Sequence, residues 1–263
     1  GGFFFHRLKM AHVLVFGIAV SLSTLVFQRD RQNVRRWAAW ALLLFIFGLV
    51  FTYTRAALLA VFVAAGALTF IARRKLRWVI GVCCLATFAL ALSSPQVRQR
   101  VESIGEKGAL ADRVRIWSYG VKMLESKPLG IGLANYPAEI SQRYEENVLN
   151  KSLPRTYAHN LLLSALVETG PLGLLAYVYC WAWLFYIGYL FLKKASHIAE
   201  EKQGVVKVLG SSAIFIFVAF ALIGLFHDIL YHKPVALTFA FAYGILLAYK
   251  IRQDRLLNVT EGS

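Results

Sequence analysis

The sequence predicts an all-α protein, a polytopic bundle of about seven transmembrane helices with a helical segment outside the bilayer, and more helices are expected upstream. Three observations predict this fold. Hydrophobic residues make up 58% of the 263 residues and charged residues only 16%, whereas about a quarter of a soluble domain is charged. The apolar residues form runs close to the roughly 20 residues that a spanning helix needs. Basic residues cluster in every second connection, as alternating helices require.

The apolar runs and the basic clusters together predict the topology. The runs cover residues 11–27, 37–54, 56–72, 78–94, 171–192, 208–226 and 234–249. The clusters are Arg29, Arg31, Arg35 and Arg36; Arg73, Arg74, Lys75 and Arg77; Lys193, Lys194, Lys202 and Lys207; and Lys250, Arg252 and Arg255. Short basic loops stay in the cytoplasm. We therefore expect transmembrane helices in 1–94, an external segment in 95–170, and three further helices with a cytoplasmic tail in 171–263.

Charge and cysteine content exclude other classes of protein. The net charge of +15 is not evidence of nucleic-acid binding, because 15 of the 29 Lys and Arg residues lie in the predicted cytoplasmic connections. Orientation in the membrane and contact with anionic lipid explain those charges. The three cysteines, Cys83, Cys84 and Cys180, lie in apolar runs and have neither disulfide nor zinc spacing.

The external segment is predicted to be partly helical. Asp112 is suited to cap a helix over 113–125, which Lys127-Pro128-Leu129-Gly130 would end. An apolar stripe at helical spacing predicts that this helix lies on the membrane surface: Val114, Trp117, Val121 and Leu124. A second short helix is expected over 139–150. A third, over 159–169, is too short to span and should bend at Gly170 and Pro171 into the helix 171–192.

Several arginines are candidates for binding an anion. Arg55 lies midway between two basic clusters, close to the outer membrane face, where it either extends to the lipid headgroups or binds a ligand. Arg113, in the first turn of the predicted helix, would offer a guanidinium beside free N–H groups. Arg115 is expected on nearly the opposite side of this helix, facing solvent. Arg98 and Arg100 lie where the fourth apolar run ends, so headgroup contact also explains them.

His159 is the candidate for proton transfer. A neutral histidine at the start of the interfacial helix is able to accept a proton from an attacking hydroxyl, although a purely capping role explains it equally well. Glu168 follows nine residues later, on the opposite side of a continuous helix. His227, Asp228, His232 and Lys233 form a polar group whose spacing matches no metal motif. The sequence therefore predicts no metal site, and it contains no cofactor motif.

Four motifs follow one another along the chain. They are Thr54-Arg55-Ala56; Arg113-Val114-Arg115-Ile116-Trp117; Lys127-Pro128-Leu129-Gly130-Ile131-Gly132-Leu133-Ala134-Asn135; and Ala158-His159-Asn160 followed by Glu168-Thr169-Gly170-Pro171-Leu172-Gly173. In their order and spacing they resemble the O-antigen ligase and polymerase superfamily of membrane glycosyltransferases. The resemblance covers residues from about 40 to 175. The several helices that usually form the N-terminal half of such proteins are not in this sequence.

The resemblance implies a metal-independent reaction on the periplasmic side of the bacterial inner membrane. Arg55 and Arg113, with Arg100, Arg98 or Arg115 as the open third choice, would hold the pyrophosphate of an undecaprenyl-linked glycan. His159 would activate the hydroxyl of the acceptor, the lipid A core of lipopolysaccharide. An O-antigen polymerase and a protein O-oligosaccharyltransferase are the alternatives. A transporter is disfavoured, because it would need ionisable residues through the middle of several helices.

Overall fold

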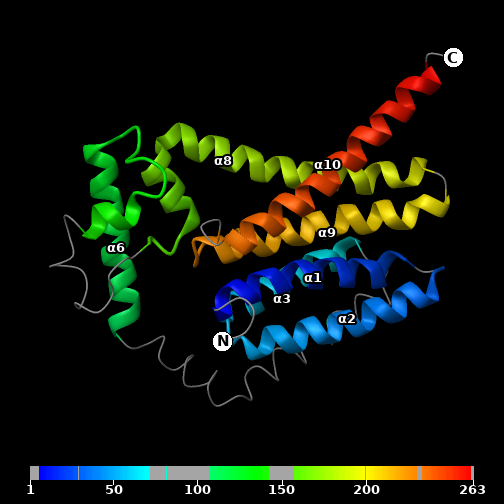
Figure 1. Ribbon diagram of the computed structural model, residues 1–263, viewed down its shortest axis with the longest axis horizontal. Coiled ribbons are helices and arrows are strands. Elements are labelled where there is room, and N and C mark those ends of the chain that lie inside the picture. Colours follow the sequence, from blue (N-terminus) through cyan, green and yellow to red (C-terminus); the bar gives the residue numbers. More distant parts are fainter. Residues whose placement is uncertain are drawn as a thin grey trace. The chain divides into compact units, whose positions relative to one another are not determined.

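The computed structural model describes residues 6–28, 30–71, 81, 107–141, 157–198, 200–229 and 233–261 (Figure 1). Every regular element in these ranges is helical, so the predicted all-α class is confirmed. The elements are α1 (Arg7–Phe27), α2 (Gln32–Phe51), α3 (Arg55–Ile71), α6 (Lys107–Ser126), α8 (Leu161–Lys194), the 3-10 turn η2 (Ala195–His197), α9 (Glu200–Gly224) and α10 (Lys233–Glu261).

The described helices are those of a membrane protein. Five segments are long and apolar enough to cross a bilayer: α1, α2, α8, residues 202–224 of α9 and residues 233–251 of α10. The apolar part of α3, Arg55–Leu68, is shorter. The predicted span 78–94 and most of the predicted helix 139–150 lie outside the described residues. The five spans agree with five of the seven predicted segments.

The chain forms two compact units, and the first contains Gly1–Thr52, Leu184–Phe217 and Leu230–Ser263. Its helices approach one another closely at small residues. A Cβ on Gly188 of α8 would lie 2.9 Å from the carbonyl oxygen of Gly210 in α9, and one on Gly17 of α1 would lie 2.6 Å from the ring of Phe45 in α2. Small residues at such contacts allow dispersion forces to hold helices together where lipid removes any hydrophobic advantage.

Three of the four basic clusters belong to this unit, and their described residues lie toward one end of it; the second cluster lies outside the described residues. Figure 1 shows the α1–α2 connection, the α8–α9 connection and the C-terminal part of α10 toward the same end. Those segments carry the first, third and fourth clusters that the sequence predicted to share one side of the membrane. Meanwhile α2 presents a wide apolar surface, with Trp37 75% and Trp40 68% exposed. A surface of that kind on a spanning helix is suited to lipid.

The second unit contains Tyr53–Trp183 and Val218–Ile229. Its longest helix, α8, is interrupted at Gly170, which has φ 69° and ψ −177°, and Pro171 follows. Pro171 has no N–H to donate, and its ring fits the first turn of a new helix. The bend that the sequence predicted between an interfacial helix and a spanning helix is confirmed, although α8 begins at Leu161 rather than at residue 159.

The glycine-rich turn that follows α6 and contains Gly130 and Gly132 packs against this bend. The N–H groups of Ile131 and Gly132 donate to the carbonyl oxygens of Val167 (3.0 Å) and Glu168 (2.9 Å). Gly130 and Gly132 both have positive φ, 98° and 94°. A Cβ on Gly130 would lie 2.5 Å from the Glu168 carbonyl oxygen. The turn therefore needs glycine for its backbone conformation and for its close approach to α8.

Helix α6 differs from the prediction in its start. It begins at Lys107, so Asp112 is inside the helix and not its N-cap. Ile116 and Met123 are buried, with Tyr136, Ile140 and other residues of this unit, whereas Val114 and Val121 are 54% and 49% exposed. The exposed Val114 and Val121 belong to the stripe that the sequence predicts to lie on the membrane surface, whereas the turn and residues 136–141 pack against another side of α6.

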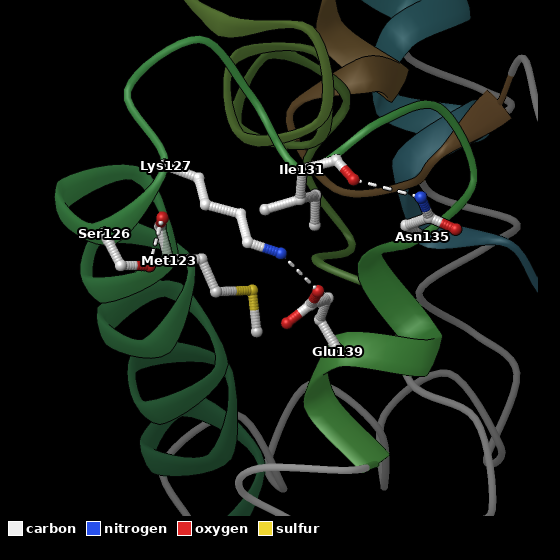
Figure 2. Close-up of polar contacts among 6 residues, drawn as sticks. All are labelled: Met123, Ser126, Lys127, Ile131, Asn135 and Glu139. Carbon is white, nitrogen blue, oxygen red and sulfur yellow. Dashed lines mark hydrogen bonds and ion pairs between the residues drawn. The ribbon is translucent and has the colours of Figure 1, made fainter.

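A salt bridge joins the end of α6 to the helical residues 136–141. Figure 2 shows Lys127 extended toward Glu139, with Nζ and Oε1 2.8 Å apart. Asn135 donates from Nδ2 to the Ile131 carbonyl oxygen at 3.0 Å and closes the turn between them. Because Lys127 is half exposed, this pair contributes little stability by itself. The geometry of the pair does fix the direction in which the helical residues 136–141 leave the turn.

We expect Gly170→Ala to lower the melting temperature of the purified protein. The alanine would have to adopt a backbone conformation that is almost restricted to glycine, at a cost of about 1–3 kcal/mol. Its Cβ would also lie 2.8 Å from the carbonyl carbon of Leu129. The measurement is thermal unfolding in detergent followed by size exclusion.

Gly244→Ala in α10 is the matched control, because a Cβ there meets nothing within 4 Å. Alanine favours a helix by about 1 kcal/mol over glycine, so this variant should melt at or above the wild-type temperature. An unchanged melting temperature in Gly170→Ala would show that the bend tolerates a side chain.

Candidate functional site

His159 occupies a strained position directly before α8. Its φ is 52°, in the left-handed region, which costs a non-glycine residue on the order of 1–2 kcal/mol. The next residue, Asn160, caps the helix: its Oδ1 accepts from the Leu163 N–H at 3.1 Å, and its carbonyl oxygen accepts from the Ser164 N–H at 2.9 Å. His159 is therefore outside the helix, and the residue is partly exposed. Strained backbone of this kind is concentrated at functional sites.

Two hydrogen bonds hold the backbone around His159. The Trp117 indole Nε1–H of α6 donates to the carbonyl oxygen of Ala158 at 2.8 Å. The His159 N–H donates to Oδ2 of Asp228 at 2.7 Å. These partners lie 41 and 69 residues away in the chain. The conformation of His159 is thus imposed by tertiary contacts on both of its sides.

Asp228 is the centre of this arrangement. The side chain is buried, and its second oxygen, Oδ1, accepts from the Ser164 hydroxyl at 2.5 Å. Burial raises the pKa of Asp228, while the hydrogen bond from Ser164, the charge of His159 and the N–H of His159 act against that rise. The carboxylate therefore joins the end of α9 to the start of α8 and fixes the His159 N–H.

The environment of His159 favours its neutral form. Packed protein around the ring lowers its pKa below the usual value of 6.5, the positive charge of Arg113 lowers it further, and the negative charge of Asp228 opposes both. A neutral imidazole has one nitrogen free to accept a proton. The residue thus has the charge state that a general base requires at neutral pH.

The arginines of α6 lie differently from one another. Arg113 is half-buried and stands one helical turn before Trp117, so both project from one side of α6. Arg115 is exposed. Because α6 begins six residues before Arg113, Arg113 is not in the first turn, and the predicted contribution of free N–H groups at that position is wrong.

The first-turn arrangement occurs instead at Arg55. The carbonyl oxygen of Thr54 accepts from the Leu58 N–H at 3.1 Å, which makes Thr54 the N-cap of α3 and Arg55 its first residue. The Arg55 side chain is exposed. Arg55, Arg113, Arg115 and His159 all belong to the second unit. Arg98 and Arg100 lie outside the described residues.

Glu168 has a structural task. Its side chain is buried, and its two oxygens accept from the N–H groups of Ala134 (3.0 Å) and Tyr136 (3.1 Å). A carboxylate at the start of the helical residues 136–141 is favourable, because it satisfies N–H groups that have no partner in the helix. Glu168 therefore stabilises the turn, and it is a poor alternative to His159 as a base.

Sequence reasoning missed the roles of Asp228 and Ser164. Asp228 was considered only as part of a polar group of doubtful metal affinity. In the part of the chain that the structure describes, no group of three or more His, Cys, Asp or Glu residues is placed to hold a metal ion. The cap at Asn160 did have a sequence signal, an Asn directly before an apolar helical run. Asp228 had none, because its partners are more than 60 residues away.

Residues 40–178 match the family model described as O-Antigen ligase. The chain belongs to the O-antigen ligase family. No curated protein matches the chain significantly. The family match spans more than half of the chain and makes the protein a glycosyltransferase-like ligase of the membrane. It includes His159 and Glu168 but ends before Asp228, so the residue that holds the His159 N–H lies in a part of the ligase that the family model does not cover.

We expect Glu168→Gln to destabilise the ligase. The amide has one oxygen, so it cannot accept from both N–H groups, and its own NH₂ would face one of these donors. Leaving a buried donor unsatisfied costs about 1–3 kcal/mol. The measurement is the melting temperature together with the amount of folded protein in membranes.

Glu125→Gln on the exposed side of α6 is the control and should melt like the wild type. Transfer activity per folded molecule distinguishes a structural Glu168 from a catalytic one. A Glu168→Gln protein that melts at the wild-type temperature but transfers no glycan would contradict the structural assignment.

Proposed function

We propose that this protein transfers O-antigen glycan from undecaprenyl pyrophosphate to the lipid A core of lipopolysaccharide, at the periplasmic face of the bacterial inner membrane. The observation that carries the proposal is the geometry of His159. Its left-handed backbone is held by Asp228 and Trp117, its neutral form is favoured, and Arg113 lies close enough to influence its charge. Membership in the O-antigen ligase family supplies the substrate class.

The reaction is a displacement at the anomeric carbon of the donor sugar. The acceptor hydroxyl gives its proton to His159 as its oxygen attacks that carbon. The bond between the anomeric carbon and the pyrophosphate oxygen breaks, and undecaprenyl pyrophosphate leaves with the bonding electrons. A general base of this kind contributes roughly 100- to 10,000-fold to a rate. No metal ion is required if cationic side chains stabilise the leaving group.

Arg55 and Arg113 are the residues to which we assign the pyrophosphate. Arg55 is the first residue of α3, so its guanidinium lies beside the helix N-terminus, where an anion is favoured. Arg113 adds a second guanidinium near His159. Arg115 or Arg100 would complete the set. A guanidinium recognises phosphate through two parallel hydrogen bonds, which a lysine ammonium cannot reproduce.

The orientation in the membrane is supported by α8. Lys193 and Lys194 lie in the last turn of α8. His159 lies two residues before Leu161, the first residue of the same helix. The bilayer therefore separates His159 from these lysines. Because short basic connections remain in the cytoplasm, His159 would face the periplasm, where lipid-linked glycan is available.

The acceptor distinguishes the ligase from its alternatives. An O-antigen polymerase would add the glycan to another lipid-linked glycan, and a protein O-oligosaccharyltransferase would add it to a hydroxyl of a protein. The banding pattern of lipopolysaccharide from a deletion strain tests the choice. Loss of every capped species supports the ligase, whereas core carrying a single repeat indicates the polymerase.

We expect His159→Ala to reduce transfer by roughly 100- to 10,000-fold, because the acceptor hydroxyl loses its base. Protein abundance and binding of the lipid-linked donor should be retained, since the arginines hold the pyrophosphate. The measurement is an in vitro assay with purified donor and acceptor. EDTA should leave wild-type transfer unchanged. A parallel loss of abundance and activity would make His159 structural.

The pH profile of transfer should report the lowered pKa of His159. The neutral form is the active one, so the rate should stay high until the pH falls below that pKa and then decline, with a midpoint below about 6.5. Asp228→Asn removes the negative charge that raises the pKa of His159, so the midpoint should move to still lower pH. A midpoint unaffected by Asp228→Asn would assign the acid limb to another group.

We expect Arg55→Lys to be nearly as damaging as Arg55→Ala, because bidentate recognition of phosphate needs the planar guanidinium. The readout is donor binding and transfer by the purified protein. Arg35→Lys, at an exposed position near the start of α2, is the matched control and should have no effect. Full activity in Arg55→Lys would show that only positive charge is needed there.

A further inference from the structure

Two leucines on the glycine-rich turn are almost fully exposed. Leu129 is 84% and Leu133 is 73% exposed. Connecting segments of this kind usually present polar side chains. Neither the transfer chemistry nor the packing of α6 explains two large apolar side chains on one short turn.

The turn that carries them is held rigidly. Gly130 packs against the backbone of Glu168 and Gly170, and the carbonyl carbon of Leu129 would lie 2.8 Å from a Cβ on Gly170. Leu133 stands between Gly132, whose N–H donates to the Glu168 carbonyl oxygen, and Ala134, whose N–H donates to Glu168 Oε2. The positions of both leucines relative to the bend of α8 are therefore fixed.

That bend lies at the edge of the bilayer. Lys193 and Lys194 mark the charged end of the span. Counting back the roughly 20 residues that cross the hydrocarbon core from Lys193 reaches about residue 173, close to Gly170. Beyond the bend, Leu172, Leu175 and Tyr179 are 75%, 64% and 66% exposed at helical spacing, which is a lipid-facing stripe on a spanning helix.

We propose that Leu129 and Leu133 insert into the acyl chains of the bilayer leaflet in which the Gly170 end of α8 lies. The turn continues the lipid-facing stripe of α8 onto the external segment at the level of the membrane surface. It anchors α6, and with it the Trp117 bond to the loop of His159, at a fixed depth. The inference rests on exposure and on the depth of the bend, not on the proposed chemistry.

In the test, a nitroxide spin label is attached at residue 129 in one protein and at residue 133 in another. Leu129→Cys and Leu133→Cys are made in a chain whose three native cysteines are replaced by alanine, and the protein is reconstituted in vesicles of phosphatidylethanolamine and phosphatidylglycerol without any polyprenyl donor. Collision of the label with oxygen, which is enriched in lipid, is compared with collision with a water-soluble nickel chelate. Leu175→Cys in α8 is the lipid-exposed control, and Glu125→Cys on α6 is the water-exposed control.

The proposal requires both turn labels to behave like the label at residue 175, with high collision with oxygen and low collision with the chelate. A label at either leucine that resembles residue 125 overturns it, because the turn would then be solvated. Low collision with both reagents also overturns it, because protein would then cover the turn. Transfer activity plays no part in these readouts, so the outcome is independent of whether the proposed function holds.

Discussion

The buried carboxylate of Glu168 is the contact around which the external part of the second unit is arranged. Its oxygens accept from the N–H groups of Ala134 and Tyr136, and its own carbonyl oxygen accepts from Gly132. These bonds join the turn after α6 to the first segment of α8, just before the bend. Removal of this acceptor would leave the buried Tyr136 N–H and the part-buried Ala134 N–H unsatisfied, so the turn and the bend stabilise each other.

A second carboxylate, Asp228, performs a related task at the other end of the same segment. It holds the His159 N–H and the Ser164 hydroxyl together and favours a backbone conformation that His159 would not adopt alone. The hydrogen bond between Asp228 and His159 goes to the backbone N–H of the histidine. The influence of the carboxylate on the imidazole is therefore electrostatic, opposing the effects of burial and of Arg113.

The family motifs acquire distinct physical meanings in this structure. The glycines of the turn and Gly170 allow backbone to approach backbone, Glu168 satisfies N–H groups, and Asn160 and Thr54 begin helices. Trp117 fixes the loop before His159. Much of the motif sequence thus builds a scaffold, and His159 and the arginines are the motif residues to which we assign the proposed chemistry. Charge at exposed or half-buried positions on a rigid scaffold is the arrangement expected of a site that binds pyrophosphate.

Local signals in the sequence were enough to predict the helical membrane fold, the bend at Gly170 and Pro171, and His159 and Arg55 as candidates. These signals are the length of the apolar runs, the chemistry of proline and the isolated ionisable residues. The predicted start of α6 after Asp112 is wrong, because the helix begins at Lys107. The meeting of Asp228 and Trp117 at the loop of His159 follows from tertiary packing alone. Those contacts join residues 41 and 69 positions apart, and a single sequence carries no information about which distant side chains the packing of helices will bring together.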